Sequence, residues 1–319
     1  MTDNRKYDEM DAAVFKANAH FDDAASIFLA RELTHVRAQV LTVKKAPLNA
    51  FTVFPVQTDI PQGADVALLR TYDNVGSAKL ITNYSDDLPR ADVAAIETAV
   101  KVHHLGASYG YSLYEVRNAA FARKPLTALK GTAARQAIDI KLNDIAWNGD
   151  SKSNITGFLG QKFNEYAPTA DGANGSTALK DKTEEQIIKD FNDFLYKIPD
   201  VTNEVEQPNT VLLPPALYSF LATKRLSDSD RTLLDFIQQS HPEVTRWIRV
   251  GELKGAGKGG KDVMFAGNFT PEYVKFEIPD RFTQLPVQYR NLEYVVDCVA
   301  STAGVTVTMP AAFVKAVGI

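Results

Sequence analysis

Residues 112–150, SLYEVRNAAFARKPLTALKGTAARQAIDIKLNDIAWNGD, carry the clearest secondary-structure pattern in the chain. Ser112 and Glu115 form a capping-box pattern, which predicts a helix that extends to about Arg123. Pro125 suits the first turn of a second helix, which would run about 34 Å to Asn148. Within this second helix, apolar residues recur every three or four positions and predict one buried face. These residues are Leu126, Leu129, Ala133, Ala134, Ala137, Ile138, Leu142 and Ile145.

The preceding stretch, residues 48–84, has the residue types of β-strands. Segments 51–56 and 66–72 are strand-like, and 77–81 follows a turn as a third strand candidate. This pattern predicts a long hairpin arm with a strand that returns to the body. Because an isolated hairpin is only marginally stable in water, such an arm requires cover from another subunit.

The rest of the chain mixes helices and strands without a regular β-α alternation, which indicates the α+β class. A short amphipathic helix is predicted within 22–40, and a second capping box at Thr183–Gln186 begins a helix after a polar loop at 167–177. Further helices are expected at 215–223 and 232–240, and strands at 210–213, 247–250, 263–266, 273–278, 294–299 and 305–308.

Length and charge limit the possible functions. At 319 residues the chain can hold two subdomains, each with its own core. Its 35 basic and 39 acidic residues give a net charge of −4, without the basic excess of a protein that grips nucleic acid. The polar first nine residues predict no secretory signal, and no window is apolar enough for a membrane span.

One glycine-rich segment resembles a phosphate-binding loop. Residues 255–262, GAGKGGKD, place Lys261 as such a loop would, but Asp262 stands where a hydroxyl residue would hold magnesium. The residues from Val263 are strand-like, whereas a phosphate loop leads into a helix. A surface loop is therefore expected, and a nucleotide-dependent enzyme is kept only as an alternative.

Other reactive residues form no convincing site. His103 and His104 are adjacent on a predicted strand, so their side chains point to opposite faces and cannot readily chelate one metal. Cys298 lies in an apolar run and is expected to be a buried strand residue. The pair Asp86-Asp87 and the loop 174–178 lack the setting that acid–base or serine chemistry needs. No catalytic residue, cofactor or metal is expected.

Short motifs along the chain nevertheless form a familiar series. They are FPV at 54–56, TYDNVGSAK at 71–79, DLPRAD at 87–92, ASYGYS at 107–112, EVR at 115–117, AAR at 133–135, NGD at 148–150 and GFL at 157–159, with GV at 304–305, MP at 309–310 and GI at 318–319. In this order they resemble the major capsid proteins of tailed bacteriophages, whose Hong Kong phage capsid fold is shared with the encapsulins. The resemblance extends over nearly the whole chain and is strongest to the encapsulin-like capsid subfamily.

This resemblance implies an α+β fold with four parts. They are an N-terminal arm at 1–44, an extended β-hairpin loop at 45–90, a peripheral domain with a long spine helix at 91–178 and 273–300, and an axial domain at 179–272 and 301–319. The extended loop would lie over an adjacent subunit. The residues expected to contact neighbouring subunits are Phe54, Ile60, Arg70, Tyr72, Lys79, Asp87 and Arg90.

The function implied is that of a major capsid protein, a structural protein rather than an enzyme. Copies would form hexamers and pentamers of an icosahedral shell that encloses DNA without sequence-specific binding. Portal, scaffolding and cement proteins would be partners, with assembly in the host cytoplasm and a final place in the virion. The alternative within the same fold is an encapsulin shell that holds cargo enzymes.

Overall fold

The computed structural model describes residues 46–80, 90–122, 126–227 and 229–319. The chain divides into two compact units, Met1–Pro47 and Leu48–Ile319, and every helix and strand of the described residues belongs to the second unit. The amphipathic helix expected within 22–40 lies outside the described residues.

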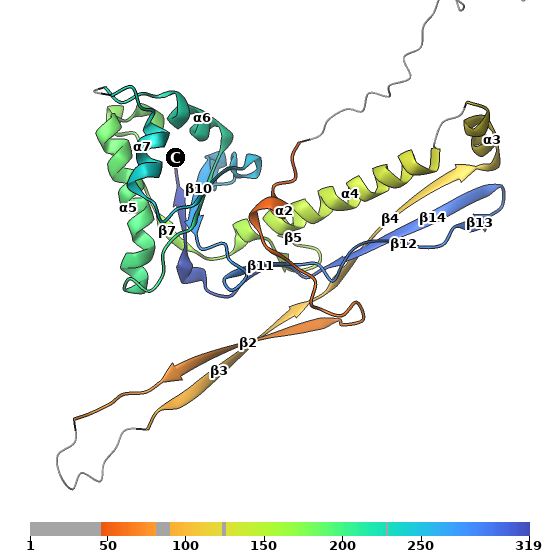
Figure 1. The fold of residues 1–319 in the computed structure, drawn as a ribbon, viewed down its shortest axis with the longest axis horizontal. Coiled ribbons are helices and arrows are strands. Elements are labelled where there is room, and N and C mark those ends of the chain that lie inside the picture. The colour runs from red at the N-terminus through yellow and green to blue at the C-terminus, as the bar shows by residue number, and fades with distance from the viewer. Residues whose placement is uncertain (1–45, 81–89, 123–125, 228) are drawn as a thin grey trace, which may run out of the picture. The chain divides into compact units, whose positions relative to one another are not determined.

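A long helix, α4 (Leu126–Asn148), packs on a sheet centred on β14 (Glu293–Thr302). β14 pairs with β4 (His103–Ser112) over its whole length and with β12 (Asp280–Gln284) and β13 (Gln288–Arg290) on its other edge. Between β4 and α4 lies α3 (Leu113–Phe121), at the same end of the sheet as β13 (Figure 1). Its capping box is confirmed, since the Ser112 hydroxyl accepts from the Glu115 amide and the Glu115 carboxylate accepts from the Ser112 amide.

A smaller sheet lies at the other end of α4. β11 (Val274–Glu277) pairs in parallel with β1 (Val56–Gln57) and antiparallel with β15 (Gly304–Val307). The short helix α2 (Ala50–Val53) precedes β1 and contacts α4. After α4, the chain turns through the β5 (Gly149–Asp150) and β6 (Ile155–Thr156) pair.

A five-stranded sheet forms a separate layered part with its own helices. The strand order is β7-β16-β10-β8-β9. The strands are β7 (Asn164–Tyr166), β8 (Thr210–Leu213), β9 (Arg246–Arg249), β10 (Val263–Gly267) and β16 (Phe313–Val317). α5 (Glu184–Thr202) packs on this sheet, and α6 (Pro215–Thr223) packs on α7 (Leu233–Ser240). The 3-10 helices are η1 (Phe158–Gly160), η2 (Ala173–Gly175), η3 (Leu179–Asp181), η4 (Gly251–Leu253), η5 (Lys258–Gly260) and η6 (Pro310–Ala312).

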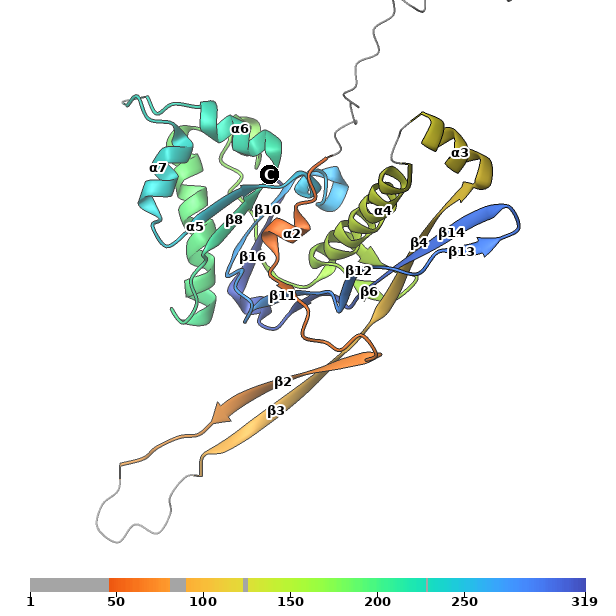
Figure 2. The same ribbon diagram turned by 45° about the vertical axis from the view of Figure 1, so that its right-hand side comes forward.

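Within the described parts of the chain, the remaining two strands, β2 (Val66–Val75) and β3 (Asp92–Lys101), pair only with each other. In Figures 1 and 2 this two-stranded ribbon extends away from the sheets of the same unit. We call it the β2–β3 ribbon.

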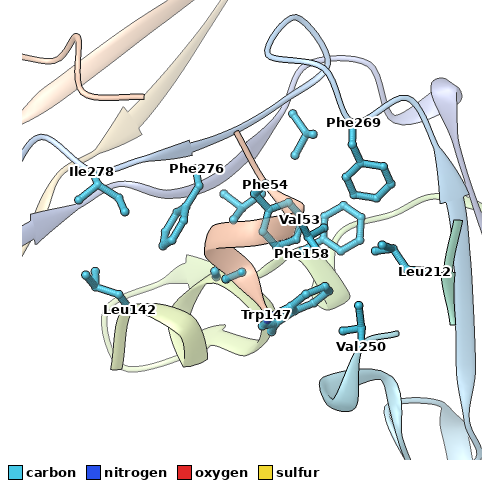
Figure 3. Close-up of a cluster of buried hydrophobic side chains, with 14 of the residues drawn as sticks. Val53, Phe54, Leu142, Trp147, Phe158, Leu212, Val250, Phe269, Phe276 and Ile278 are labelled. Atoms are coloured by element: carbon cyan, nitrogen blue, oxygen red, sulfur yellow. The ribbon is translucent and has the colours of Figure 1, made fainter. Parts of the chain in front are cut away.

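Two hydrophobic cores hold the unit together. The first lies between α4, α2, the sheets of β11 and β14 and one face of the five-stranded sheet, and its centre is a group of aromatic rings (Figure 3). Phe158 sits in this group, with ring centroids 5.0 Å from Phe54, 6.0 Å from Trp147 and 5.8 Å from Phe269. The second core lies between α5, α6, α7 and the five-stranded sheet. Residues 179–266, together with Val314 and Ala316, supply its buried members.

Several expected elements are confirmed, and others are wrong. The helices expected from 112, 125, 183, 215 and 232 and the six later strands are present with ends shifted by a few residues. Segment 51–56 is not one strand, because Ala50–Val53 is helical and buries Val53 in the first core. The candidate at 77–81 is not the returning strand, since residues 77–80 have no regular structure and β3 makes the pairing instead.

The predicted single face of α4 is also divided. Ala134, Ile138, Leu142 and Ile145 are buried, as expected. Leu129, Ala133 and Ala137 are exposed, because they lie on a neighbouring side of the helix that no other part of the described chain covers. Apolar spacing alone could not separate the two sides, since both carry apolar residues.

Candidate assembly surface

The β2–β3 ribbon is a long and largely exposed element of regular structure. Its strands form ten antiparallel pairs, from Val66 opposite Lys101 to Val75 opposite Asp92. β3 is exposed at every position except Val100. Two strands with both edges open and little burial are marginal in water and form a template for further contacts.

One face of the ribbon carries four exposed apolar side chains beside the charged residues Arg70, Glu97 and Lys101. Side chains of paired residues lie on the same face of a sheet, and every second residue along a strand returns to it. Val66, Leu68, Tyr72 and Val93 therefore share a face, and each is about half exposed or more, Tyr72 at 65%. We call this set the apolar ribbon face. Water contact with four such side chains is unfavourable, so a covering surface would be stabilised by their burial.

An ion pair crosses the centre of this face. Arg70 Nε donates to Glu97 Oε1 at 2.7 Å, and the two residues are directly opposite in register. Both side chains are more than half exposed, so the pair contributes at most about 1 kcal/mol to folding. It helps to fix the strand register and places one positive and one negative charge at the centre of this face.

The ribbon joins the body at a defined root. The Val102 amide, just after β3, donates to the Asp65 carbonyl at 2.9 Å, and Val102 is buried. On the incoming side, the chain reaches β2 from β1, whose residues hydrogen-bond to β11. The root therefore connects the exposed ribbon to the sheet of β1, β11 and β15.

The residues expected to contact neighbouring subunits lie in different parts of the chain. Arg70 and Tyr72 lie on the ribbon and are exposed, whereas Ile60 is half-buried between β1 and β2. Lys79 and Arg90 are exposed in segments without regular structure next to β2 and β3. Asp87, like Asp86, lies outside the described residues.

Phe54 requires a correction. Its side chain is 2% exposed, and its ring packs on Trp147, Phe158 and Phe269 at centroid distances of 4.9, 5.0 and 6.1 Å. It has no surface left for a neighbouring chain, so it belongs to the core of its own subunit.

Two exposed features were not predicted from the sequence, the second strand of the ribbon and a second apolar surface. Val93 and Ile96 are exposed on β3, and the β-branched residues of 92–101 were the available signal. At the α3 end of the sheet centred on β14, Tyr114, Phe121 and Leu292 are also exposed. The Leu113 amide donates to the Leu292 carbonyl at 3.1 Å, which ties α3 to the β13–β14 turn.

The glycine-rich segment is a closed surface loop. The Asp262 carboxylate accepts from the Gly255 amide at 2.9 Å, and the Lys261 carbonyl accepts from the Gly257 amide at 2.8 Å. β10 begins at Val263, so a strand follows the loop, as expected, rather than a helix. The Asp262 carboxylate thus accepts the hydrogen bond of the Gly255 amide, which a phosphate-binding loop would offer to the phosphate.

The other candidate residues also have structural positions. His103 and His104 lie on β4, whose burial alternates along the strand. Burial raises the pKa of the Cys298 thiol, which lies in β14 within the first core. Among the described residues there is no group of His, Cys, Asp and Glu that could hold a metal ion. Over the same residues, no helix is long and apolar enough to cross a membrane.

Known proteins resemble this chain in both sequence and fold. The profile of a family described as major capsid protein matches residues 76–319. The chain belongs to the major capsid protein family. No curated protein matches this capsid protein.

Solved structures agree with the family. The capsid protein is similar to a chain in the capsid of Myoviridae phage XM1, with a TM-score of 0.76 and 18% identity over 93% of this chain and 100% of that one. It is similar to a chain of the capsid of an empty GTA particle, with a TM-score of 0.63 and 11% identity over 89% and 94%. A chain of Mycobacterium phage Adephagia gives a TM-score of 0.59 and 15% identity over 90% and 95%.

These likenesses confirm the expected α+β fold of the Hong Kong phage type. They give the encapsulin alternative no better support than the phage capsid.

Proposed function

We propose that this capsid protein assembles with copies of itself, through hexamers and pentamers, into the icosahedral head shell that encloses phage DNA. The observation that carries the proposal is the apolar ribbon face, which the described residues of its own chain leave uncovered. A second copy is the natural cover, because closed symmetry repeats one modest contact many times and makes the assembly strong. The net charge of −4 suits a shell that contains DNA without holding it.

Within the shell, we assign roles to the parts of the chain. The extended loop would begin after β1 and return through β3, so that it is longer at its C-terminal side than the 45–90 expected. Residues 1–44 would form the arm, the sheet of β14 with α4 the peripheral domain, and the five-stranded sheet with α5 to α7 the axial domain. Portal, scaffolding and cement proteins would be partners, and assembly would take place in the host cytoplasm.

The test is assembly of purified full-length protein, measured by sedimentation velocity and electron microscopy. Wild-type protein should sediment as capsomers or shells. The double variant L68S/Y72S removes two large apolar side chains from the ribbon face without touching either core. It should keep the wild-type circular dichroism spectrum and lose assembly.

The matched control is Val205→Ser, which removes an apolar side chain that is 76% exposed and lies outside the ribbon. It should assemble as the wild type does. A wild-type protein that stays monomeric at all concentrations would contradict the proposed function. A ribbon variant that assembles normally would show that the ribbon is not the contact.

A further inference from the structure

The sheet that anchors the ribbon contains a buried carboxyl group with one oxygen that has no partner among the described residues. Glu277, the last residue of β11, is 4% exposed. Among the described residues its Oε2 atom has no hydrogen-bond partner. Burying an ionised carboxylate without partners costs several kcal/mol, whereas a protonated carboxyl group is much cheaper to bury.

A second buried carboxyl group in the same chain has the opposite surroundings. Asp190 accepts hydrogen bonds from the Tyr166 hydroxyl at 3.1 Å and the Thr169 hydroxyl at 2.9 Å, and it is paired with the Lys182 ammonium. This is how a fold supports a buried charge. The Oε2 atom of Glu277 makes no such contact among the described residues, so the environment of this carboxyl group suits the neutral form.

Glu277 stands at the root of the ribbon. It is opposite Gln57 of β1 on one side and Gly304 of β15 on the other. Its backbone carbonyl accepts from the Ala303 amide at 3.0 Å and the Thr302 hydroxyl at 2.9 Å. Gln57 is the last residue of β1, from which the chain runs out to the ribbon, so a charge on Glu277 would appear where three strands hold the ribbon in place.

The charged groups around this position do not compensate a carboxylate. Burial is the main reason that the pKa of Glu277 is raised, and the nearby carboxylate of Asp59, just after β1, raises it further. Lys275 on β11 acts in the opposite direction but does not outweigh them. Of the other neighbouring strands, β15 contributes Gly304 opposite Glu277, and β4 contributes His103 opposite Thr302. Burial lowers the pKa of His103, which favours the neutral form of its ring.

We propose that Glu277 carries its proton in this conformation and that loss of the proton loosens the root of the β2–β3 ribbon. The attachment of the ribbon would then depend on pH, independently of whether the ribbon contacts a second copy.

The direction in which pH changes the stability of the root follows from the difference in the pKa of Glu277 between the closed and the open root. The pKa of Glu277 is higher in the closed root than in an open one, where it would be about 4.3. The stability of the closed root is thus complete below about pH 4.3 and is lost as the pH rises through the raised pKa. Between these two values, the opening constant should increase by up to about tenfold per pH unit and then level off.

The experiment is hydrogen–deuterium exchange of the full-length protein over a pH series, corrected for the intrinsic rate at each pH. The reporter amides are Phe276 and Ile278, which donate to the carbonyls of Pro55 and Gln57, and Ala303. Peptides from β10 serve as the internal reference, since β10 lies in the middle of the five-stranded sheet. Wild-type protein should lose protection at the root as the pH rises while β10 does not.

Three variants separate this device from a merely structural role. Glu277→Gln keeps the shape and cannot ionise, so the pH dependence at the root should disappear. Asp59→Asn should make the exchange level off at a lower pH with a smaller total increase, and Lys275→Met should do the reverse. If wild type and Glu277→Gln show the same pH dependence, or if neither shows any, the proposal is overturned.

A second measurement covers the case in which Glu277→Gln fails to fold. As the pH is raised, one infrared band of a protonated carboxyl group should persist in the wild type after the solvent-exposed carboxyl groups, of pKa about 4, have ionised. It should disappear at higher pH together with root protection. A wild type that keeps no such band once the exposed carboxyl groups have ionised would refute the proposal.

Discussion

Replacement of Lys182 by Met tests how much the buried ion pair of Lys182 and Asp190 contributes to folding stability. The Lys182 side chain is fully buried, and its ammonium group donates to the Thr169 carbonyl at 2.6 Å and pairs with Asp190 and, at 3.0 Å, with Asp171. Burial alone would lower the pKa of Lys182, but the bonds to these two carboxylates outweigh it and raise the pKa. Methionine keeps most of the length of the side chain and removes the ammonium group, with its charge and its hydrogen-bond donors.

The magnitude follows from what Lys182→Met leaves behind. Asp190 is also fully buried, and without its cation it becomes an uncompensated charge. Breaking a buried pair from one side costs about 3–5 kcal/mol, a large part of the roughly 5–15 kcal/mol that stabilises a typical protein. In the double variant K182M/D190N both charges are gone, and the remaining donors can still bond to the amide oxygen. It should therefore recover part of the loss.

The assay is urea unfolding of the unassembled protein, followed by circular dichroism. Lys180→Met is the matched control, because Lys180 is exposed and two positions away, and it should change the free energy of unfolding by less than about 0.5 kcal/mol. A Lys182→Met variant that unfolds within about 1 kcal/mol of the wild type would refute this account of the buried pair.

Three further substitutions have defined outcomes. Phe158→Ala opens a cavity among the aromatic rings of the first core and should lower the free energy of unfolding by about 3–5 kcal/mol in the same urea assay; a loss below about 1 kcal/mol would contradict that packing. Gly149→Ala forces a side chain into a left-handed position (φ 76°) with its Cβ against the Ile155 carbonyl oxygen, so a loss of about 1–3 kcal/mol is expected, and an unchanged midpoint would exclude the strain. Ser112→Ala removes the cap that bonds to the Glu115 amide and should cost about 1 kcal/mol, seen as faster amide exchange confined to α3; unchanged exchange there would argue against the cap.

The sequence could predict those elements whose signals are local. The capping boxes at Ser112 and Thr183 correctly place the starts of α3 and α5, because the bonds that begin a helix involve residues three positions apart. The strand after the glycine-rich loop was also predictable, since its run of apolar residues begins at Val263. The family motifs led to the correct fold by resemblance.

Other features depend on distant residues and could not be derived in this way. Residues 51–53 have strand-like side chains, yet they are helical. Val53 and Phe54 are buried in the first core, where the Phe54 ring packs on the rings of Trp147, Phe158 and Phe269. The partner of β2 is β3 rather than residues 77–81. The two strands form ten residue pairs, and the composition of 77–81 did not reveal that the pairing strand comes later in the chain. Glu277 gave no signal at all, because only the three-stranded sheet shows that its carboxyl group is buried without a partner among the described residues.

The most direct test of self-assembly through the ribbon is a cryo-electron microscopy map of particles formed by the full-length protein. We predict that Leu68 and Tyr72 of each subunit lie buried against a second copy of the chain. A map in which shells form while the apolar ribbon face remains in solvent, or folds back on its own subunit, would contradict the claim.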